Sequence, residues 1–199
     1  MITRDIILHE ILIPSLLRLY ETDHFNLQIG ASERNICARL AYHMESIMRE
    51  YDRIHGNHDF DRYFVDVEYN RMENDKLKHI MTGEHERRYI VSDLLIQRRG
   101  YGGNLLAAEL KRKGNNKGAE EDRNRLMSLV SPGTGQVDDN CVHDTLLGAF
   151  IVFSSVEAQV ELYEAVNGVG ENTGEFRCFF GADARWQVKF GNPGPGERE

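Results

Sequence analysis

A pair of apolar segments joined by a glycine turn constrains the fold of this chain more than any other feature. Residues 89–113 read YIVSDLLIQRRGYGGNLLAAELKRK, with Asp93 in the first segment and Glu109 and Lys111 in the second. Residues equally far from a hairpin turn come side by side on neighbouring strands, so we expect Asp93 and Glu109 to meet. Lys111 shares a face with Glu109, because side chains alternate along a strand. The segment therefore predicts two carboxylates and an ammonium at one point.

The second segment of this hairpin is apolar on both faces. Residues 105–108 and 110 are all leucine or alanine, which is typical of a strand buried on both sides. A Glu-x-Lys pair on a solvated strand is common and is usually structural. Ionised groups on a buried strand need partners or a chemical role, so burial favours a functional interpretation of Glu109 and Lys111.

The hydrophobic periodicity of the whole chain predicts an α/β fold with a mixed central sheet flanked by helices on both sides. Helices are expected over 5–21, kinked or divided at Pro14, over 32–51 with Ser32 as N-cap, and over 119–130 and 156–166. Strands are expected over 62–70, in the two halves of the hairpin, over 146–154, and once or twice within 175–190. Residues 71–88 are predicted as a charged connector and 168–174 as a loop.

The composition predicts a single domain over residues 1–190, followed by a flexible tail at 191–199. The chain has 199 residues, of which 41% are hydrophobic and 28% are charged, as in ordinary globular proteins. It contains no apolar run of about 18 residues, and its first segment lacks a signal cleavage site, so we expect no membrane span and a cytoplasmic location. Three cysteines at unrelated spacings suggest neither disulfides nor a zinc site.

The charge is distributed unevenly along the sequence. The formal net charge is −8, yet residues 62–125 form a net-positive third between two acidic ones. This third contains Asp93, Glu109 and Lys111. A polyanion would be steered towards it and repelled elsewhere, although the contrast is modest.

The predicted cluster has the chemistry of a phosphodiesterase. Asp93 and Glu109 offer the hard oxygen ligands that Mg²⁺ or Mn²⁺ prefers, and the carbonyl of Leu110 would add a further oxygen. A metal-bound water can then become the attacking group. Lys111 would hold this water or help to deprotonate it, and would screen the developing negative charge.

The arrangement of Asp93, a hairpin turn and Glu109-x-Lys111 resembles the PD-(D/E)XK nuclease superfamily, which has the restriction-endonuclease-like fold. The expected helix, strand, hairpin, helix and strand over about residues 32–155 are similar to the αβββαβ core of that superfamily. Ser92 stands where the family name has proline, which is a backbone residue rather than a ligand. The resemblance implies that Asp93 and Glu109 bind metal and that Lys111 is the catalytic lysine.

The same resemblance extends to residues outside the hairpin. Glu33, at the start of the predicted helix 32–51, is a further candidate catalytic residue as a ligand of metal or water, although an acid there also favours the helix by itself. Asp122 and Arg125, in the predicted helix 119–130, lie where members often place auxiliary polar residues. Asp66 and Glu68 share one strand face and rank below Asp93 and Glu109.

Four basic residues are candidates for nucleic-acid binding. Arg98 and Arg99 stand beside the hairpin turn, where they would either hold phosphates or keep the tip soluble. Lys113 and Lys117 flank a flexible loop suited to phosphate contact, with a solvated loop as the simpler alternative. Trp186 and the phenylalanines at 176, 179 and 180 are expected in the core, not in a base-stacking platform.

Together these features predict a Mg²⁺-dependent endonuclease that hydrolyses phosphodiester bonds in DNA. A homodimer would suit this activity, because two symmetric sites can cut both strands of a duplex. Two alternatives stay open. One is an inactive module of the same fold that binds nucleic acid or a protein partner. The other is a metal-dependent enzyme of an unrelated α/β fold that acts on a nucleotide or another phosphate ester.

Overall fold

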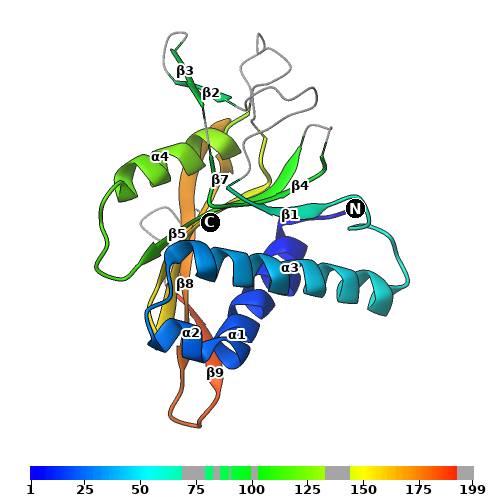
Figure 1. The fold of residues 1–199 in the computed structure, drawn as a ribbon. Coiled ribbons are helices and arrows are strands. Elements are labelled where there is room, and N and C mark those ends of the chain that lie inside the picture. The colour runs from blue at the N-terminus through cyan, green and yellow to red at the C-terminus, as the bar shows by residue number, and fades with distance from the viewer. Residues whose placement is uncertain (69–78, 83–85, 90, 100–102, 133–143, 192–199) are drawn as a thin grey trace.

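A seven-stranded mixed sheet forms the centre of the protein in a computed structural model, which describes residues 1–68, 79–82, 86–89, 91–99, 103–132 and 144–191 (Figure 1). Its strand order is β1-β4-β5-β6-β7-β8-β9, and every neighbouring pair is antiparallel except β5 and β6. The strands are β1 (Phe64–Val67), β4 (Leu94–Gln97), β5 (Asn104–Arg112), β6 (Leu147–Phe153), β7 (Glu157–Val166), β8 (Val169–Phe180) and β9 (Trp186–Phe190). The expected mixed α/β sheet is therefore confirmed.

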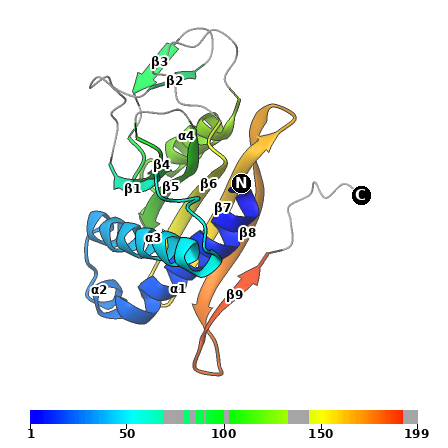
Figure 2. The same ribbon diagram turned by 90° about the vertical axis from the view of Figure 1, so that its right-hand side faces the viewer.

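Helices cover both faces of this sheet, as the sequence predicted (Figures 1 and 2). One face carries α1 and α3, and the other carries α4. In chain order the helical segments are the π-helical turn η1 (Ile6–Leu12), α1 (Ile13–Thr22), α2 (His24–Gln28), α3 (Glu33–His55) and α4 (Ala119–Val130). No helix among the described residues has both the length and the apolar character needed to cross a membrane.

The ends of α3 follow directly from its sequence. The side chain of Ser32 accepts a hydrogen bond from the Asn35 N–H at 3.2 Å, so the predicted N-cap is confirmed. Gly56 ends the helix in the left-handed conformation, with φ of 62°, which glycine adopts without steric cost. These two caps place Glu33 in the first turn, at the edge of the sheet where β5 ends.

Pro14 marks a change of helical winding near the N-terminus. The chain winds as a π-helix over Ile6–Leu12 and as an α-helix from Ile13 onwards, with Pro14 in the first turn of α1. Proline has no N–H to donate, so the first turn is the position of an α-helix that tolerates it. The expected division of the helix at Pro14 is confirmed, although the chain continues in the same direction.

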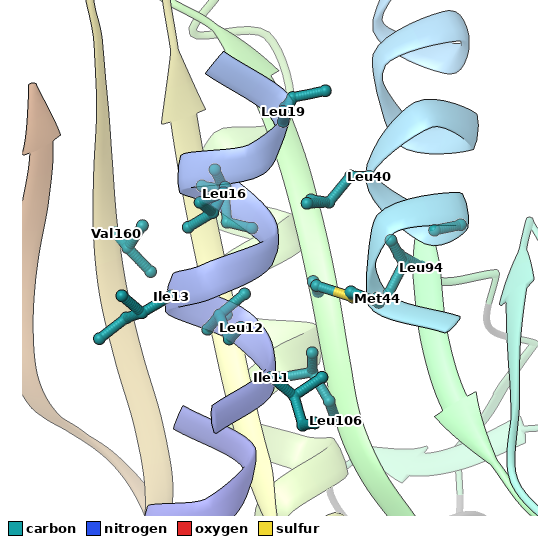
Figure 3. Close-up of a cluster of buried hydrophobic side chains, with 14 of the residues drawn as sticks. Ile11, Leu12, Ile13, Leu16, Leu19, Leu40, Met44, Leu94, Leu106 and Val160 are labelled. Carbon is teal, nitrogen blue, oxygen red and sulfur yellow. The ribbon is translucent and has the colours of Figure 1, made fainter. Parts of the chain in front are cut away.

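The main core lies between the sheet and the pair α1 and α3. Figure 3 shows α1 and α3 directing their apolar side chains onto β4, β5 and β7. The buried contacts include Ile11, Leu12, Ile13, Leu16, Leu19, Leu40, Met44, Leu94, Leu106 and Val160. A smaller core beneath α4 contains Leu95, Ala107, Leu126, Leu129, Val130, Phe150 and Tyr163. Cys37 and Cys178 are buried free thiols, and Cys141 lies outside the described residues.

The helix predicted over 156–166 is wrong, because these residues form β7. Ala158, Val160 and Leu162 are buried, and they alternate with more exposed side chains. This period of two matches a strand that pairs with both β6 and β8. The glutamates and alanines of the segment favour a helix locally, but pairing on both sides overrides that preference.

Three smaller expectations also change. The loop predicted over 168–174 is wrong, because β8 begins at Val169 and a tight turn at Asn167 and Gly168 joins it to β7. The connector predicted over 71–88 contains, where it is described, a hairpin of β2 (His79–Thr82) and β3 (Glu86–Tyr89). The short helix α2 was not predicted. The tail at 192–199, residues 69–70 of the strand predicted over 62–70, and the glycines of the turn at 100 and 102 lie outside the described residues.

Substitution of Leu106 tests the packing of the main core. It is fully buried on β5, so Leu106→Ala is expected to lower the free energy of unfolding by about 2–5 kcal/mol through lost contacts and a residual cavity. Urea denaturation measures this change. The matched control is Ile54→Ala, whose side chain is 63% exposed on α3 and should shift stability by less than about 0.5 kcal/mol. Equal losses in the two variants would contradict the packing described here.

Candidate functional site

The structure brings Asp93 and Glu109 next to each other, as the hairpin pattern predicted. Leu94 pairs with Ala108 across β4 and β5, which places Asp93, one residue before β4, beside Glu109 on β5. Oδ2 of Asp93 accepts a hydrogen bond from the Leu110 N–H at 2.8 Å. The side chain of Asp93 therefore continues the hydrogen bonding of the sheet beyond the end of β4.

This hydrogen bond also indicates where the Leu110 carbonyl lies. In an antiparallel pair, the N–H and C=O of one strand residue both face the same neighbouring strand. Because the Leu110 N–H faces Asp93, its carbonyl oxygen belongs to the same side of β5. The candidate ligands Asp93 and Leu110 thus share one side of the strand.

Glu109 and Lys111 lie on the face of β5 that α4 covers, and both contact that helix. Nζ of Lys111 lies 2.8 Å from Oδ2 of Asp122, and Nε of Arg125 lies 2.9 Å from Oε1 of Glu109. Arg125 also pairs with Asp122 one turn away on α4. The predicted shared face of Glu109 and Lys111 is confirmed, and Asp122 and Arg125 join the cluster as direct partners.

The ion pair between Glu109 and Arg125 is close but poorly aligned. Glu109 is 2% exposed, and its Oε1 and the Arg125 Nε are both buried without a partner in hydrogen-bond geometry among the described residues. A buried carboxylate oxygen left in this way is costly unless another group satisfies it. The Glu109 carboxyl is therefore open to a further donor or cation.

Burial sets the protonation of the two hairpin carboxyls. Burial raises the pKa of Glu109 to about 8, with Arg125 opposing the shift and Asp93 and Asp122 adding to it. Burial likewise raises the pKa of Asp93, which the hydrogen bond from the Leu110 N–H partly opposes. Burial thus favours the protonated form of Glu109 in the metal-free protein, while Arg125 favours the ionised form.

Lys111 remains charged in spite of its surroundings. Burial lowers the pKa of its ammonium, but the hydrogen bond and charge of Asp122 outweigh burial, so the pKa is raised overall. Asp93 and Glu33 act in the same direction. Lys111 therefore stays positively charged, next to two carboxyls, Asp93 and Glu109, whose pKa values are raised.

Glu33 reaches the same end of β5 from the first turn of α3. Its Oε1 accepts hydrogen bonds from the Arg112 N–H and from Nδ2 of Asn115, both at 2.9 Å. These bonds tie the start of α3 to the end of β5 and to the loop that follows. Glu33 lies within electrostatic reach of Lys111, but the observed contacts are structural.

The four basic residues predicted to bind nucleic acid lie in two places. Arg98 and Arg99 follow β4, at the end of the hairpin opposite to Asp93, and Arg99 forms an ion pair with Asp66. Lys113 and Lys117 follow β5, close to the candidate site. Nζ of Lys113 lies 2.6 Å from Oε1 of Glu157, whereas the side chain of Lys117 is exposed.

The two lower-ranked acids do not join Asp93 and Glu109. Asp66 accepts a hydrogen bond from Nε2 of Gln97 at 2.7 Å and pairs with Arg99 near the hairpin turn. Glu68 pairs with Arg34 at 3.0 Å, although its backbone N–H donates to the Asp93 carbonyl. Neither carboxylate therefore extends the acidic centre.

The direct roles of Asp122 and Arg125 were only loosely indicated by the sequence. They are three residues apart on α4, and Leu126 and Leu129 continue the same buried face. Polar residues on the apolar stripe of a helix need partners when that stripe packs on a sheet. Polar residues on the apolar stripe of this helix were therefore the sequence signal that pointed to Asp122 and Arg125.

The donors at the site fit a hard divalent cation in kind. Asp93, Glu109 and Leu110 offer carboxylate and carbonyl oxygens, and the buried Oε1 of Glu109 lacks a well-aligned partner. Within the described residues, no three acidic, histidine or cysteine side chains converge closely enough to form a metal-binding group. The donor chemistry thus suits Mg²⁺, while the side chains pair with Lys111, Arg125 and the Leu110 N–H.

Comparison with known proteins does not assign this chain to a family. The sequence matches no protein-family model, and a search of curated proteins finds no significant relative. The geometry of the site and the order of the elements therefore carry the functional argument.

The raised pKa of Glu109 predicts a pH-dependent stability in the metal-free protein. Between about pH 4.5 and 8, the folded protein holds a proton that the unfolded chain has lost, so raising the pH through this window removes stability. Glu109→Gln removes that titration. We expect the variant to gain stability relative to the wild type as the pH rises, by up to about 1.4 kcal/mol per pH unit. Urea denaturation at several pH values measures the difference.

The exposed Glu171 on β8 supplies a control for this experiment. Glu171→Gln makes the same chemical change at an exposed position, so it controls for the substitution itself. A constant difference between Glu109→Gln and the wild type across the window would show that Glu109 does not titrate there.

Proposed function

We propose that this chain is a Mg²⁺- or Mn²⁺-dependent endonuclease of the restriction-endonuclease-like fold, which hydrolyses phosphodiester bonds in DNA. The observation that carries the proposal is the meeting of Asp93, Glu109 and Lys111 at one end of β4 and β5. Two carboxyls that share a strand end with a charged lysine are what metal-assisted phosphodiester hydrolysis requires.

The order and pairing of the elements support the proposed fold. In chain order, α3, β1, β4, β5, α4 and β6 follow the pattern αβββαβ, with the hairpin β2–β3 inserted after the first strand. β1, β4 and β5 pair antiparallel, and β5 pairs parallel with β6 through the crossover that contains α4. This arrangement agrees with the core that the resemblance to the PD-(D/E)XK superfamily implies.

In this proposal, Asp93, Glu109 and the Leu110 carbonyl hold the divalent cation. When bound, the cation supplies Lewis acidity, which screens charge on the phosphoryl group and makes a water acidic. Glu109 must give up its proton to act as a ligand. Arg125, at 2.9 Å from Glu109 Oε1, favours that ionised form.

Lys111 orients the attacking water and the phosphate. Its ammonium has three N–H donors, and Nζ forms an ion pair with Asp122, 2.8 Å from Oδ2. The remaining donors can reach a water or a phosphate oxygen, because the side chain keeps 17% of its surface exposed. Asp122 thus keeps Lys111 charged and fixes its direction, so Asp122 is a positioning residue in this mechanism.

The basic residues around β5 suit a polyanionic substrate. Lys113 and Lys117 follow the site on the chain and would contact phosphates on one side of the scissile bond. Arg98 and Arg99 lie at the other end of the hairpin, so they would contact a distant part of a long substrate. The net-positive middle third of the sequence agrees with this placement.

A second candidate function is an inactive module of the same fold that binds nucleic acid or a protein partner. One observation favours it: the candidate ligands are engaged by basic groups or by the backbone, and no metal-binding group is formed within the described ranges. Such a module would bind DNA in a salt-dependent manner without any response to divalent cations.

Substitution of the three central residues tests the proposed activity. Asp93→Ala, Glu109→Ala and Lys111→Ala are each expected to reduce Mg²⁺-dependent cleavage of DNA by at least about a hundredfold, because each removes a metal ligand or the charge beside the phosphate. Cleavage of labelled oligonucleotides measures the rate. Lys189→Ala on β9, an exposed lysine far along the sheet, is the control and should retain full activity.

Two results would contradict the nuclease. Cleavage that persists in all three variants would show that Asp93, Glu109 and Lys111 do not carry out the reaction. A wild-type protein that turns over mononucleotide esters but no oligonucleotide would favour an enzyme for small phosphate esters.

Metal binding can be tested without turnover. Mg²⁺ or Mn²⁺ at about a hundredfold excess over its Kd is expected to raise the Tm of the wild type by about 5–10 °C, because a ligand that binds only the folded state stabilises it. Asp93→Asn should lose this shift while remaining folded. Calorimetry measures both proteins, and equal shifts in the two would exclude Asp93 as a ligand.

A further inference from the structure

A concave feature separate from the candidate site lies at the end of the sheet where β5 and β6 finish. It is a pocket of about 710 Å³, which falls within the usual range of roughly 300–1,000 Å³ for ligand sites. Its walls come from the junction of α1 and α2, the turn between β6 and β7, and the hairpin of β8 and β9. The lining includes the aromatic residues Tyr20, His24, Phe180 and Trp186, together with Glu21 and Arg185.

Aromatic rings form most of the apolar wall of this pocket. The ring of Trp186 lies 4.4 Å from that of Tyr20 and 5.3 Å from that of Phe180, between centroids, and 6.4 Å from the ring of His24. Phe180 remains 54% exposed. The expectation that Phe180 belongs to the core is therefore wrong, because it stands at the rim of the pocket while Phe176 is buried.

The end of β6 lies between this pocket and the candidate active site. Oη of Tyr20 donates to the Ser154 carbonyl at 3.0 Å, and the Lys113 N–H donates to the Phe153 carbonyl at 2.8 Å. Lys113 stands two residues after Lys111. Lys111 pairs with Val152 across β5 and β6, and the pocket residue Ser155 lies in the turn that follows β6. The pocket and the candidate site thus lie near the same end of β5 and β6 but on opposite faces of the sheet, since α1 and α2 wall the pocket whereas α4 covers Glu109 and Lys111.

Basic side chains line the path between the two features. The Arg112 guanidinium lies 5.3 Å from the centre of the Phe153 ring, and the side chain of Lys113 is 58% exposed. Arg185 lines the pocket itself. Two acids lie nearby: Glu157 pairs with Lys113, and Glu21 lines the pocket. A phosphate backbone that leaves Lys111 and Lys113 would pass around the end of β5 and meet Arg112 on the opposite face before it reaches the aromatic wall.

We propose that this aromatic pocket binds an unpaired nucleobase of the strand whose phosphate lies at Asp93, Glu109 and Lys111. The inference rests on the proposed function and narrows its substrate to single-stranded DNA or to duplex ends with an overhang. Aromatic side chains stack on every type of base, whereas the bases inside a duplex already stack on one another and cannot enter. The pocket thus selects for unpaired nucleotides without reading their sequence.

Trp186 allows a direct test, because it is the single tryptophan of the chain. We expect its fluorescence to be quenched in a saturable manner by oligothymidine, and not by a blunt duplex, in metal-free buffer at one fixed salt concentration. Phe180→Ala should weaken oligothymidine binding about tenfold, as the loss of a stacking surface predicts. The matched control is Phe190→Ala, also on the outer hairpin and 48% exposed, which does not line the pocket.

A second measurement guards against a folding defect. Anisotropy of a labelled oligothymidine gives the affinity of Trp186→Phe, which keeps an aromatic ring and should retain most of the binding. An oligonucleotide of abasic sites, with phosphates but without bases, should bind the wild type about as weakly as oligothymidine binds Phe180→Ala.

The outcomes separate this inference from the nuclease activity. If oligothymidine quenches Trp186, Phe180→Ala weakens this binding and the wild type cleaves no DNA, the base-binding pocket is supported and the proposed nuclease activity is wrong. Cleavage by a wild type that shows no quenching, or equal binding by Phe180→Ala and Phe190→Ala, would overturn the pocket. Equal affinity for the abasic strand and oligothymidine would overturn it as well.

Discussion

The hydrogen bond from the Leu110 N–H to the Asp93 carboxylate is the interaction on which the arrangement of the candidate site depends. β4 begins at Leu94, so the Asp93 side chain takes the place of a backbone acceptor at the next position along β5. A buried N–H left without an acceptor costs about 1–3 kcal/mol, which gives Asp93 a structural reason to be there. The same bond sets Asp93 beside Glu109. The two carboxyls therefore meet at the point where the pairing of β4 with β5 ends.

Helix α4 supplies the charges that this pair needs. Glu109 is almost fully buried, and an isolated charge there would be strongly unfavourable. Arg125 faces Glu109, and Asp122 faces both Lys111 and Arg125, so positive and negative groups alternate across the interface of α4 and β5. A nearly balanced cluster of this kind is compatible with burial, and the raised pKa of Glu109 further reduces its net charge.

The sequence alone predicted the parts of the structure whose signals are local. The alternation across the hairpin, the N-cap at Ser32 and the apolar stripe of α3 each depend on neighbouring residues, and each was predicted correctly. The segment 156–166 was not, because its identity as β7 depends on β6 and β8 on either side. The partners of Glu109 and Lys111 also escaped a firm prediction, since Asp122 and Arg125 meet them only when α4 packs on β5. Local preference yields to long-range packing at these points.

The parallel pairing of β5 with β6 has a consequence for how the protein assembles. Between Arg112 and Leu147 the chain must leave the sheet, form α4 and return before the two strands can meet. Pairing between segments so distant in sequence is slow, because the entropy of closing the connection is lost before any contact forms. The hairpin of β4 and β5 can form early, but Glu109 gains its counter-ion only when α4 docks. The ionic cluster therefore forms after the hairpin, and a nascent chain that ends before α4 would leave Glu109 without its counter-ion on an apolar strand.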